Sequence, residues 1–574
     1  MVVRKRFCDE FNYIWIDCLN GDSRETGKQT PDGQPDPSVF STEYNREGIQ
    51  LGTSVGIFAK TDGGGAPVVR YREFWGTDKR ALLLKTLDVT GPFDEQYQTV
   101  EPATNNRFSF RPGKRRGHYA EWPAVVEFAE EDPISGLEEN RRGALMAHDK
   151  DILAERMSHY LDKTTAWETF AQNGGGLASD AARFRASTTR NRVQKAETFQ
   201  PEQLRRYTLF PLDGRWCYYS TVRPLWNEPR PELVSQTPKN ESFFVVRRYA
   251  ERVNEGRPAL ITSGLPDRHL LRSHAVGIPL RLNAAPALIS AGQAQASIFA
   301  QAEDTKKSSA NLSKQVRAYL ASLTKANVDE DEALSRAIWF HSLAVIYSPL
   351  YLSEHADAIS GDWPRVPLPT SLNVLQESAQ IGITVGQLLD VERAVLGVTS
   401  GKLRRELSLL GRITGPKSLS LSITAGWGHY QEKRQIVMPG RGLEKKREFT
   451  TEEKQSIADG GADLGLSIED ALMIWGGSTI DIYLNNEAHW SNIPEAVWEY
   501  TVGGYQVLKK WLSYREEEVL GRAITKEEAR EFTHMARRIA ALLLLEPNLD
   551  QNYISTKADF YVWKSASSAV LAPA

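Results

Sequence analysis

Short apolar runs mark the first hundred residues of the chain. The segments 13–19 and 53–59 are rich in β-branched and aromatic side chains, a composition that predicts buried strands. The alternating sequence PVVRYREFW at 67–75 predicts a third strand. A doubly wound sheet needs several further strand–helix units before such strands. We therefore expect residues 1–100 to be an α/β remnant, the last strands of a Rossmann-like sheet.

Helical periodicity replaces this pattern further along. Apolar residues recur at helical spacing over 150–172, and the sequence Asn-Gly-Gly-Gly at 173–176 predicts the end of that helix. Residues 200–290 instead contain short runs separated by proline and glycine, which is typical of strands and turns. We expect a helical or linker region over 101–200 before the next domain.

The C-terminal half predicts mostly helices. Helical spacing recurs in four segments, 303–358, 371–412, 495–515 and 525–545. Residues 419–440 have the pattern of strands, and Thr525 with Glu528 has the spacing of a capping box. We expect 201–560 to form a mixed α+β domain with a helical C-terminal part, and 561–574 to be a disordered tail.

The segment 208–233 mixes aromatic rings, arginines and four prolines. A turn at 211–214 predicts a hairpin, with alternate side chains on its two faces. Two interpretations remain open. The rings form the core of a small sheet, or they stack on bases while the arginines bind guanine or phosphate. Arginine follows apolar residues again at 243–248 and 277–281, which favours nucleic-acid binding.

Composition narrows the class of protein. The hydrophobic fraction is 41% and the charged fraction 25%, as in globular proteins, and no run of about 18 apolar residues could span a membrane. The N-terminus lacks the apolar segment of a signal peptide. Three scattered cysteines fit a reducing compartment and argue against a structural metal. We expect a cytoplasmic protein with no membrane partner.

Charge is distributed unevenly although the net charge is only −3. Three runs are strongly basic, namely 183–195, 402–412 and 433–447. Each run is either a solvated surface or part of a cleft whose cations neutralise phosphates.

Motifs of self-contained catalysis are missing from the sequence. The Ser-Gly-Lys-Leu sequence at 400–403 lacks the first glycine and the hydroxyl of a phosphate-binding Walker loop. No HExxH motif occurs, and no GxGxxG motif follows a strand. We therefore expect no catalytic, cofactor-binding or metal-binding residues in this chain.

Four separated segments carry a resemblance to a known family. The sequence PLDGRWCYY at 211–219 resembles a signature of target-recognition domains in large restriction–modification methyltransferases, with leucine in place of the usual phenylalanine. The segments 26–52, 347–369 and 497–515 are similar to stretches of type ISP enzymes, which are single-polypeptide, ATP-driven restriction–modification proteins. The resemblance covers nearly the whole chain, in order.

The resemblance implies more domains than the sequence contains. A complete enzyme of this family has a nuclease, an ATPase motor, a coupler, an adenine N6-methyltransferase and a recognition domain. The glycine-rich loop for S-adenosylmethionine and the Asn/Asp-Pro-Pro-Tyr/Phe motif that holds a flipped adenine are not in this sequence. We therefore expect the end of the methyltransferase domain followed by the specificity domain, with S-adenosylmethionine, ATP and magnesium belonging to the complete enzyme.

The function that follows is recognition of a short duplex DNA sequence for a restriction–modification system. The side chains predicted to contact DNA are Arg215, Tyr218, Tyr219, Arg223, Asn227, Arg247, Arg248 and Arg281. Asp213 is expected to cap the turn.

Two other interpretations stay open. In the first, an upstream polypeptide supplies the missing motifs, and the two chains form an active S-adenosylmethionine-dependent adenine methyltransferase. In the second, the chain is the product of a truncated gene and binds little.

Overall fold

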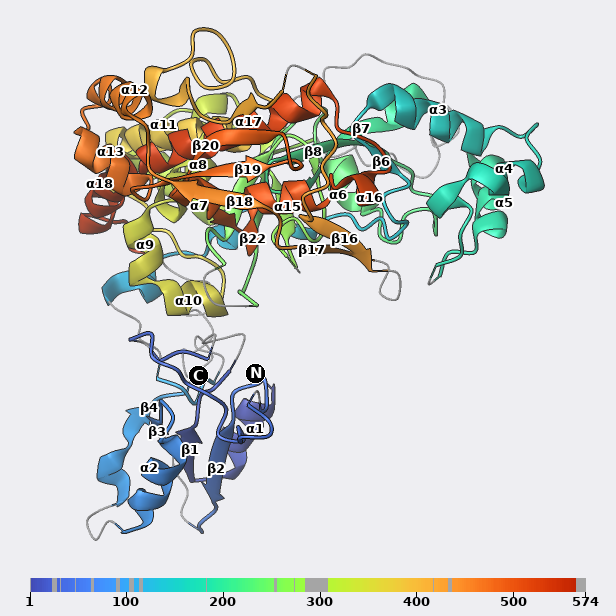
Figure 1. The fold of residues 1–574 in the computed structure, drawn as a ribbon. Coiled ribbons are helices and arrows are strands. Elements are labelled where there is room, and N and C mark those ends of the chain that lie inside the picture. The colour runs from blue at the N-terminus through green and yellow to red at the C-terminus, as the bar shows by residue number, and fades with distance from the viewer. Residues whose placement is uncertain are drawn as a thin grey trace. The chain divides into compact units, whose positions relative to one another are not determined.

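The computed structural model of the chain divides into two compact units, coloured by residue number in Figure 1. Unit 1 comprises Met1–Gly117, Tyr249–Glu255 and His355–Asp362, and unit 2 comprises the remaining residues. The structure describes residues 2–22, 28–30, 32–46, 48–62, 67–88, 93–102, 108–112, 117–181, 183–251, 255–272, 274–283, 308–416, 418–431 and 436–563. The predicted tail lies outside these residues from 564 onward.

Unit 1 is built on a four-stranded sheet with the order β2-β1-β3-β4. Its elements are α1 (Val2–Glu10), β1 (Tyr13–Cys18), β2 (Ser54–Ala59), β3 (Val68–Glu73), α2 (Lys79–Lys85), β4 (Gln98–Val100) and α10 (Ala356–Gly361). The three strands predicted in this region are therefore present. β1 and β3 are parallel, whereas β2 and β4 are antiparallel to their neighbours. These strands alone do not define a Rossmann-like sheet.

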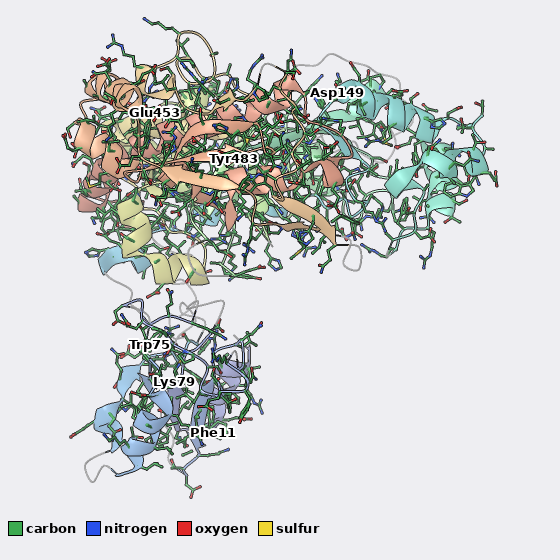
Figure 2. All side chains as sticks on the ribbon, viewed as in Figure 1. Phe11, Trp75, Lys79, Asp149, Glu453 and Tyr483 are labelled. Carbon is green, nitrogen blue, oxygen red and sulfur yellow. The ribbon has the colours of Figure 1, made fainter. Side chains whose placement is uncertain are left out.

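One face of this sheet holds the core of unit 1. Ile14, Val69 and Tyr71 are buried there, and the ring of Phe7 from α1 lies 4.8 Å from that of Phe58. Lys79, labelled in Figure 2, is buried at the start of α2. Its ammonium group lies 2.6 Å from the Asp36 carboxylate and donates a hydrogen bond to the Leu19 carbonyl oxygen. A buried lysine needs such a partner, so this pair fixes the loop after β1.

Unit 2 contains three four-stranded sheets. Their orders are β10-β9-β12-β5, β11-β7-β8-β6 and β15-β20-β19-β18. The strands are β5 (Ile134–Ser135), β6 (Met146–Ala147), β7 (Leu204–Phe210), β8 (Asp213–Tyr218), β9 (Phe243–Val246), β10 (Ala259–Thr262), β11 (Leu265–Pro266), β12 (Val276–Pro279), β15 (Arg412–Thr414), β18 (Glu444–Arg447), β19 (Thr479–Tyr483) and β20 (His489–Pro494). Among the described residues, three two-stranded sheets complete the strands, β13 (Arg281–Leu282) with β14 (Ser309–Ala310), β16 (Gly428–Gln431) with β17 (Ile436–Pro439), and β21 (Thr501–Val502) with β22 (Tyr505–Gln506). The short strands predicted over 200–290 and 419–440 are confirmed.

Helices surround these sheets, and α3, α4 and α5 lie together beyond β6 (Figure 1). The helices of unit 2 are α3 (Lys150–Leu161), α4 (Trp167–Asn173), α5 (Ala186–Ala196), α6 (Pro231–Gln236), α7 (Lys314–Leu323), α8 (Glu332–Ile346), α9 (Pro349–Glu354), α11 (Leu372–Leu389), α12 (Thr451–Ala462), α13 (Ile468–Ile474), α14 (Glu495–Trp498), α15 (Val507–Ser513), α16 (Glu517–Leu520), α17 (Lys526–Leu544) and α18 (Glu546–Ala558). The fold class is mixed α and β with several small sheets.

The closest helix pair in the core is α8 with α11. Eleven residues of α8 are buried, and Gly382 of α11 faces the Phe340 carbonyl so closely that a Cβ at this position has no room. His341 of α8 is fully buried between the Ser378 hydroxyl and the Pro367 carbonyl oxygen, each 2.7 Å from a ring nitrogen. Since imidazole loses hydration here, burial lowers the pKa of His341 to about 4.

Three predicted helices differ from the structure. The helix predicted over 150–172 is divided into α3 and α4 by the turn after Asp162, whose carboxylate accepts hydrogen bonds from Thr164. The helix over 495–515 is interrupted by the β21–β22 hairpin, whose turn glycines both have positive φ. The helix over 371–412 ends at Leu389, because the glycine-containing loop that follows is held by Arg538, which donates to the Asp390 carbonyl oxygen.

Capping boxes begin two of the C-terminal helices. Thr525 and Glu528 form the predicted box at α17, each side chain satisfying a backbone N–H of the other residue. An equivalent box at α12 uses Thr450 and Glu453, the latter labelled in Figure 2. Both glutamates also accept hydrogen bonds from an arginine, so each helix start is fixed to a neighbouring segment.

Candidate nucleic-acid interface

The segment that suggested base stacking forms the β7–β8 hairpin at the centre of unit 2. Tyr207 pairs with Arg215 and Leu204 pairs with Tyr218 across the hairpin. The turn consists of Pro211 and Leu212, and Leu212 has a φ of 61°. The predicted hairpin is therefore confirmed.

Asp213 at the start of β8 is the anion of a buried charge cluster. Its carboxylate lies 2.8 Å from an Arg215 guanidinium nitrogen and 3.1 Å from one of Arg515, which follows α15. Burial alone would raise the pKa of Asp213, but the charges of Arg215 and Arg515 hold that pKa below its usual value. His148 accepts a hydrogen bond from Arg515 at 3.1 Å through Nδ1. The structure thus places the Asp213 carboxylate in a cluster with Arg215 and Arg515 in place of the predicted turn cap.

The ion pair with Asp213 holds the Arg215 side chain inside the domain. Arg215 is only 9% exposed, and its guanidinium also lies 5.5 Å from the ring centroid of Tyr514. Tyr218, fully buried, stacks on Phe199 with ring centroids 5.8 Å apart. For these two residues the core interpretation describes the structure, because neither presents its side chain at the surface.

Arg247 and Arg281 are also buried, at 4% and 6% exposure. The Arg281 guanidinium donates to the Ser335 hydroxyl at 3.0 Å, to the Asp329 carbonyl oxygen at 2.9 Å and to both oxygens of Ser308. Four of the five N–H donors of Arg281 are thus used inside the protein, and its buried side chain does not reach a base edge. In this conformation, the structure gives Arg281 an internal bridging role in place of the predicted DNA contact.

The other four predicted residues are accessible to solvent: two are exposed and two are half-buried. Two of the four lie close together. Arg223 is exposed, and Asn227 is half-buried four residues further along. Tyr219 is half-buried at the end of the hairpin, and the exposed Arg248 lies 6.0 Å from the Trp363 ring centroid in another part of unit 2. Only Arg223 and Asn227 are therefore joined in one surface.

Helix α5 lies beside this surface and is fixed by its buried side chains. Arg190 donates three hydrogen bonds of 2.8–2.9 Å, to the carbonyl oxygens of Tyr160, Asp162 and Thr165. Gln194, one helical turn later, donates to the Asp162 carbonyl oxygen at 2.9 Å. These bonds satisfy the free carbonyls at the C-terminus of α3 and hold α5 against it. The opposite side of α5 is thereby presented to solvent.

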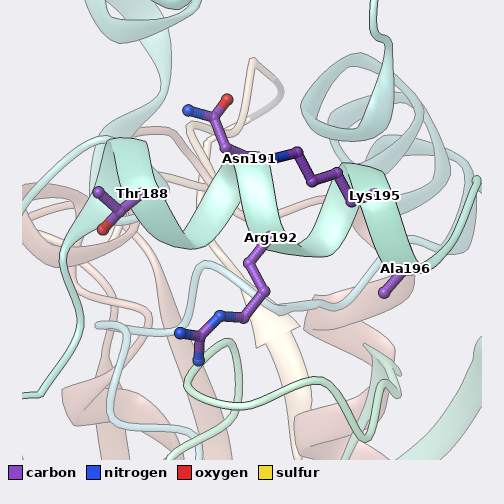
Figure 3. A pocket seen from close by; sticks show the side chains of 5 residues that line it. All are labelled: Thr188, Asn191, Arg192, Lys195 and Ala196. Atoms are coloured by element: carbon purple, nitrogen blue, oxygen red, sulfur yellow. The ribbon is translucent and has the colours of Figure 1, made fainter.

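The exposed side of α5 carries four polar residues at helical spacing. Thr188, Asn191, Arg192 and Lys195 line a shallow hollow of about 420 Å³, shown in Figure 3. Their spacing of three and four residues places them on one face of the helix. In Figure 3, Asn191 and Arg192 leave the helix at opposite margins of this face. Arg192 donates to the Arg223 carbonyl oxygen at 3.1 Å, which joins α5 to the loop after β8.

Positive charge exceeds negative charge where α5 meets this loop. Arg183 and Arg223 place guanidinium nitrogens 3.1 and 3.0 Å from the Glu228 carboxylate, and Arg230 lies 3.7 Å from it. Burial would raise the pKa of Glu228, but the hydrogen bond from Arg183 and the arginine charges keep that pKa below its usual value. One carboxylate thus faces three arginines. We call this surface, formed by Arg183, Thr188, Asn191, Arg192, Lys195, Arg223 and Asn227, the α5 face.

The α5 face contains residues that the sequence motifs did not single out. The run 183–195 was recognised as basic, with five cations and no carboxylate, but its Asn191, Arg192 and Lys195 were not proposed as contacts. The helical spacing of 188, 191, 192 and 195 was the available signal. The two other basic runs lie elsewhere in unit 2.

Other kinds of site find no support in the described part of the chain. Among the described residues, no group of three or more His, Cys, Asp or Glu side chains is placed to hold a metal ion. No helix built from these residues has the length and apolar character needed to cross a bilayer.

The arrangement defines an α+β domain that presents a cationic, amide-bearing helix on its surface. A family model described as the Type ISP C-terminal specificity domain matches residues 133–542. The chain belongs to this family, as the resemblance predicted. No curated protein matches the chain.

Solved structures with a similar fold include two Type ISP restriction–modification enzymes and the DrdV–DNA complex. The ATP-dependent Type ISP enzyme LlaBIII bound to DNA gives a TM-score of 0.57 at 13% identity, over 98% of this chain and 32% of that one. A nuclease-deletion mutant of the Type ISP enzyme LlaGI with a DNA substrate mimic gives 0.52 at 14% identity, over 98% and 45%. The DrdV–DNA complex gives 0.53 at 14% identity, over 96% and 48%. The chain thus spans about a third to a half of these proteins.

Proposed function

We propose that this chain recognises a short duplex DNA sequence for a restriction–modification system, and that the α5 face is its base-reading surface. The observation that supports this most strongly is the combination of Asn191, Arg192 and Lys195 on one exposed helical face within the specificity domain. The related structures of LlaBIII, LlaGI and DrdV contain DNA or a DNA mimic.

The chemistry of the α5 face suits the major groove of DNA. A helix fits into that groove, where asparagine pairs with adenine, arginine with guanine, and a lysine neutralises phosphate. Arg183 and Arg223 sit at the margin of the helix, where cations position the duplex backbone. Of the residues predicted from sequence, Arg223 and Asn227 belong to this proposed contact, and Tyr219 and Arg248 remain separate candidates.

Selection from a pool of random duplexes tests this proposal. The full chain, immobilised and washed at increasing salt, is expected to enrich duplexes that share a short sequence. The double variant Asn191→Ala/Arg192→Ala is expected to enrich no common sequence or a different one. Enrichment of the same sequence by this double variant would exclude the α5 face as the reader. If the wild-type chain enriched no sequence, DNA recognition by the chain itself would be excluded.

We also propose that unit 1 is the end of a methyltransferase sheet. Two features support this. β2 is an edge strand, and it exposes Val55 and Ile57 at 44% and 46% on the face opposite the core, beside Tyr13 at 39%. Unpaired edges and exposed apolar patches are usually covered by another element. The domain limits at 100 and 200 stay part of this proposal.

The chemistry of that methyltransferase is not carried by this chain. The sequence has no glycine-rich cofactor loop and no Asn/Asp-Pro-Pro-Tyr/Phe motif, so we derive no step through S-adenosylmethionine, ATP or magnesium. Mixing the chain with a polypeptide that carries both motifs tests whether the two form one enzyme. Complex formation with slower amide exchange in β2, and methyl transfer only in the mixture, are expected. Unchanged exchange in β2 would contradict the shared sheet.

A further inference from the structure

A second group of basic residues lies on helix α17, in a different part of unit 2 from α5 (Figure 1). Arg530, His534 and Arg537 follow one another at helical spacing, and Arg530 is exposed while the other two are half-buried. Thr533 between them donates to the Gly411 carbonyl oxygen at 2.7 Å, which brings the start of β15 against the helix. The next residue, the exposed Arg412, thereby joins the group.

The three arginines of this group are not neutralised by carboxylates within the described parts of the protein. No ion pair joins Arg412, Arg530 or Arg537 to any described carboxylate, and the buried Nε of Arg537 has no hydrogen-bond acceptor there. Burial and then the charge of Arg412 lower the pKa of Arg537. Burial and then the charges of Arg537, Arg538 and Arg530 lower the pKa of His534 to about 4.

Such an arrangement destabilises the free protein. The charge of Arg412 disfavours the charge of Arg537, and an unpaired buried guanidinium N–H loses its hydration without compensation. Elsewhere in unit 2, comparable arginines are paired, as Arg447 is with Glu453 and Asp481 at 2.8 and 3.0 Å. An external anion that accepts from Arg412, Arg530 and Arg537 together would remove both penalties.

We propose that Arg412, Arg530, His534 and Arg537, the α17 patch, bind the phosphate backbone of the duplex that the α5 face reads. This inference rests on the proposed function and extends it from reading bases to holding the backbone. The seven residue steps from Arg530 to Arg537 span about 10 Å of helix. One DNA strand places a phosphate every 3.4 Å or so of duplex axis, so several phosphates fall within reach.

The salt dependence of binding tests the α17 patch. Anisotropy titrations of the full chain with a labelled duplex of arbitrary sequence give the slope of log K against log salt. The double variant Arg530→Gln with Arg537→Gln removes two phosphate contacts. It is expected to reduce the magnitude of this slope by about 1.8 and to weaken binding to all duplexes equally. The charge-keeping pair Arg530→Lys with Arg537→Lys is expected to retain the slope.

Matched controls separate this effect from a general loss of charge. Lys314→Gln with Lys325→Gln removes two exposed cations on and beside α7 and is expected to leave the slope unchanged. Equal slopes for the wild-type chain and the Arg530→Gln/Arg537→Gln variant would overturn the proposal that the α17 patch binds DNA. An equal reduction of the slope in the α7 control variant would overturn it too. If tripolyphosphate bound to the wild-type chain but not to the Arg530→Gln/Arg537→Gln variant, while the salt slope for duplex DNA was the same in both, the patch would be assigned to a free polyphosphate and the inference would be overturned.

The two proposals fail in different ways. Loss of sequence preference in α5 variants with an unchanged slope in α17 variants would overturn only the α17 patch. Absence of duplex binding by the wild-type chain would overturn both.

Discussion

Arg515 places a guanidinium nitrogen 3.1 Å from the carboxylate of Asp213, although 302 residues separate them in the sequence. Both side chains are at most 1% exposed. The bond joins the β7–β8 hairpin to the end of α15, so the two ends of the specificity domain share one buried charge cluster. Charges this deep are stable only as a complete set.

Removing one member of that cluster is expected to destabilise the domain strongly. Arg515→Ala leaves Asp213 with Arg215 alone and opens space beside His148, and loss of a buried partner costs about 3–5 kcal/mol. The midpoint of urea unfolding, followed by tryptophan fluorescence, measures this. Arg522→Ala is the control, because its pair with Glu528 is 39% exposed on the arginine side and is expected to cost less. Equal costs for the two variants would contradict the account.

Arg281 is expected to affect stability and not DNA affinity. Arg281→Ala removes four hydrogen bonds and leaves the Asp329 carbonyl and Ser335 hydroxyl without their donor, for an estimated cost of about 3 kcal/mol. The fraction that stays folded is expected to bind duplex DNA as the wild type does. Anisotropy on folded protein checks this, and weaker binding at equal stability would return Arg281 to the DNA contacts.

Acid is expected to destabilise unit 2 partly through His341. Its folded pKa of about 4 lies below the ordinary value of 6.5, so below pH 6.5 the unfolded chain takes up a proton that the folded state refuses. Between pH 7 and pH 5 this amounts to about 2 kcal/mol for the single group. His341→Gln, which can still reach Ser378 and Pro367, is expected to lose less stability over that interval in urea titrations. An equal loss in both proteins would contradict the assignment.

Lys195 is expected to act on phosphate and not on sequence. Lys195→Gln removes one cation of the α5 face while the anchoring residues Arg190 and Gln194 remain in place. The expected result is uniformly weaker binding to all duplexes, with the salt slope reduced by about 0.9. Anisotropy with the selected duplex and a scrambled duplex measures both. A loss confined to the selected duplex would show that Lys195 reads a base.

The sequence predicted the elements whose signals are local. The capping box at Thr525, the hairpin turn at 211–214 and the three strands of unit 1 each depend on neighbouring residues, and all are present. The helix predicted through 390–412 was wrong, because contacts from Arg538, over 140 residues away, stabilise a loop there. Local periodicity does not contain such partners.

The candidate site shows the same limit. Arg215 and Arg281 have the residue type of a DNA contact, but whether an arginine faces solvent depends on distant partners such as Asp213 with Arg515 and Asp329. Arg223 lies at the surface, where it pairs with the Glu228 carboxylate that Arg183 and Arg230 also face. The basic run at 183–195 predicted a surface, and its helical spacing would have predicted the exposed face.

The central claim is that the α5 face distinguishes one DNA sequence from others. The most direct measurement is the ratio of Kd values for the selected duplex and a scrambled duplex, compared between the wild-type chain and the Asn191→Ala/Arg192→Ala variant. The control variant, Lys454→Ala/Gln455→Ala, changes two adjacent exposed residues on α12. The account predicts that the α5 variant loses about 1–3 kcal/mol of discrimination for each base contact removed, while the control keeps the wild-type ratio. An unchanged ratio in a folded α5 variant would contradict it.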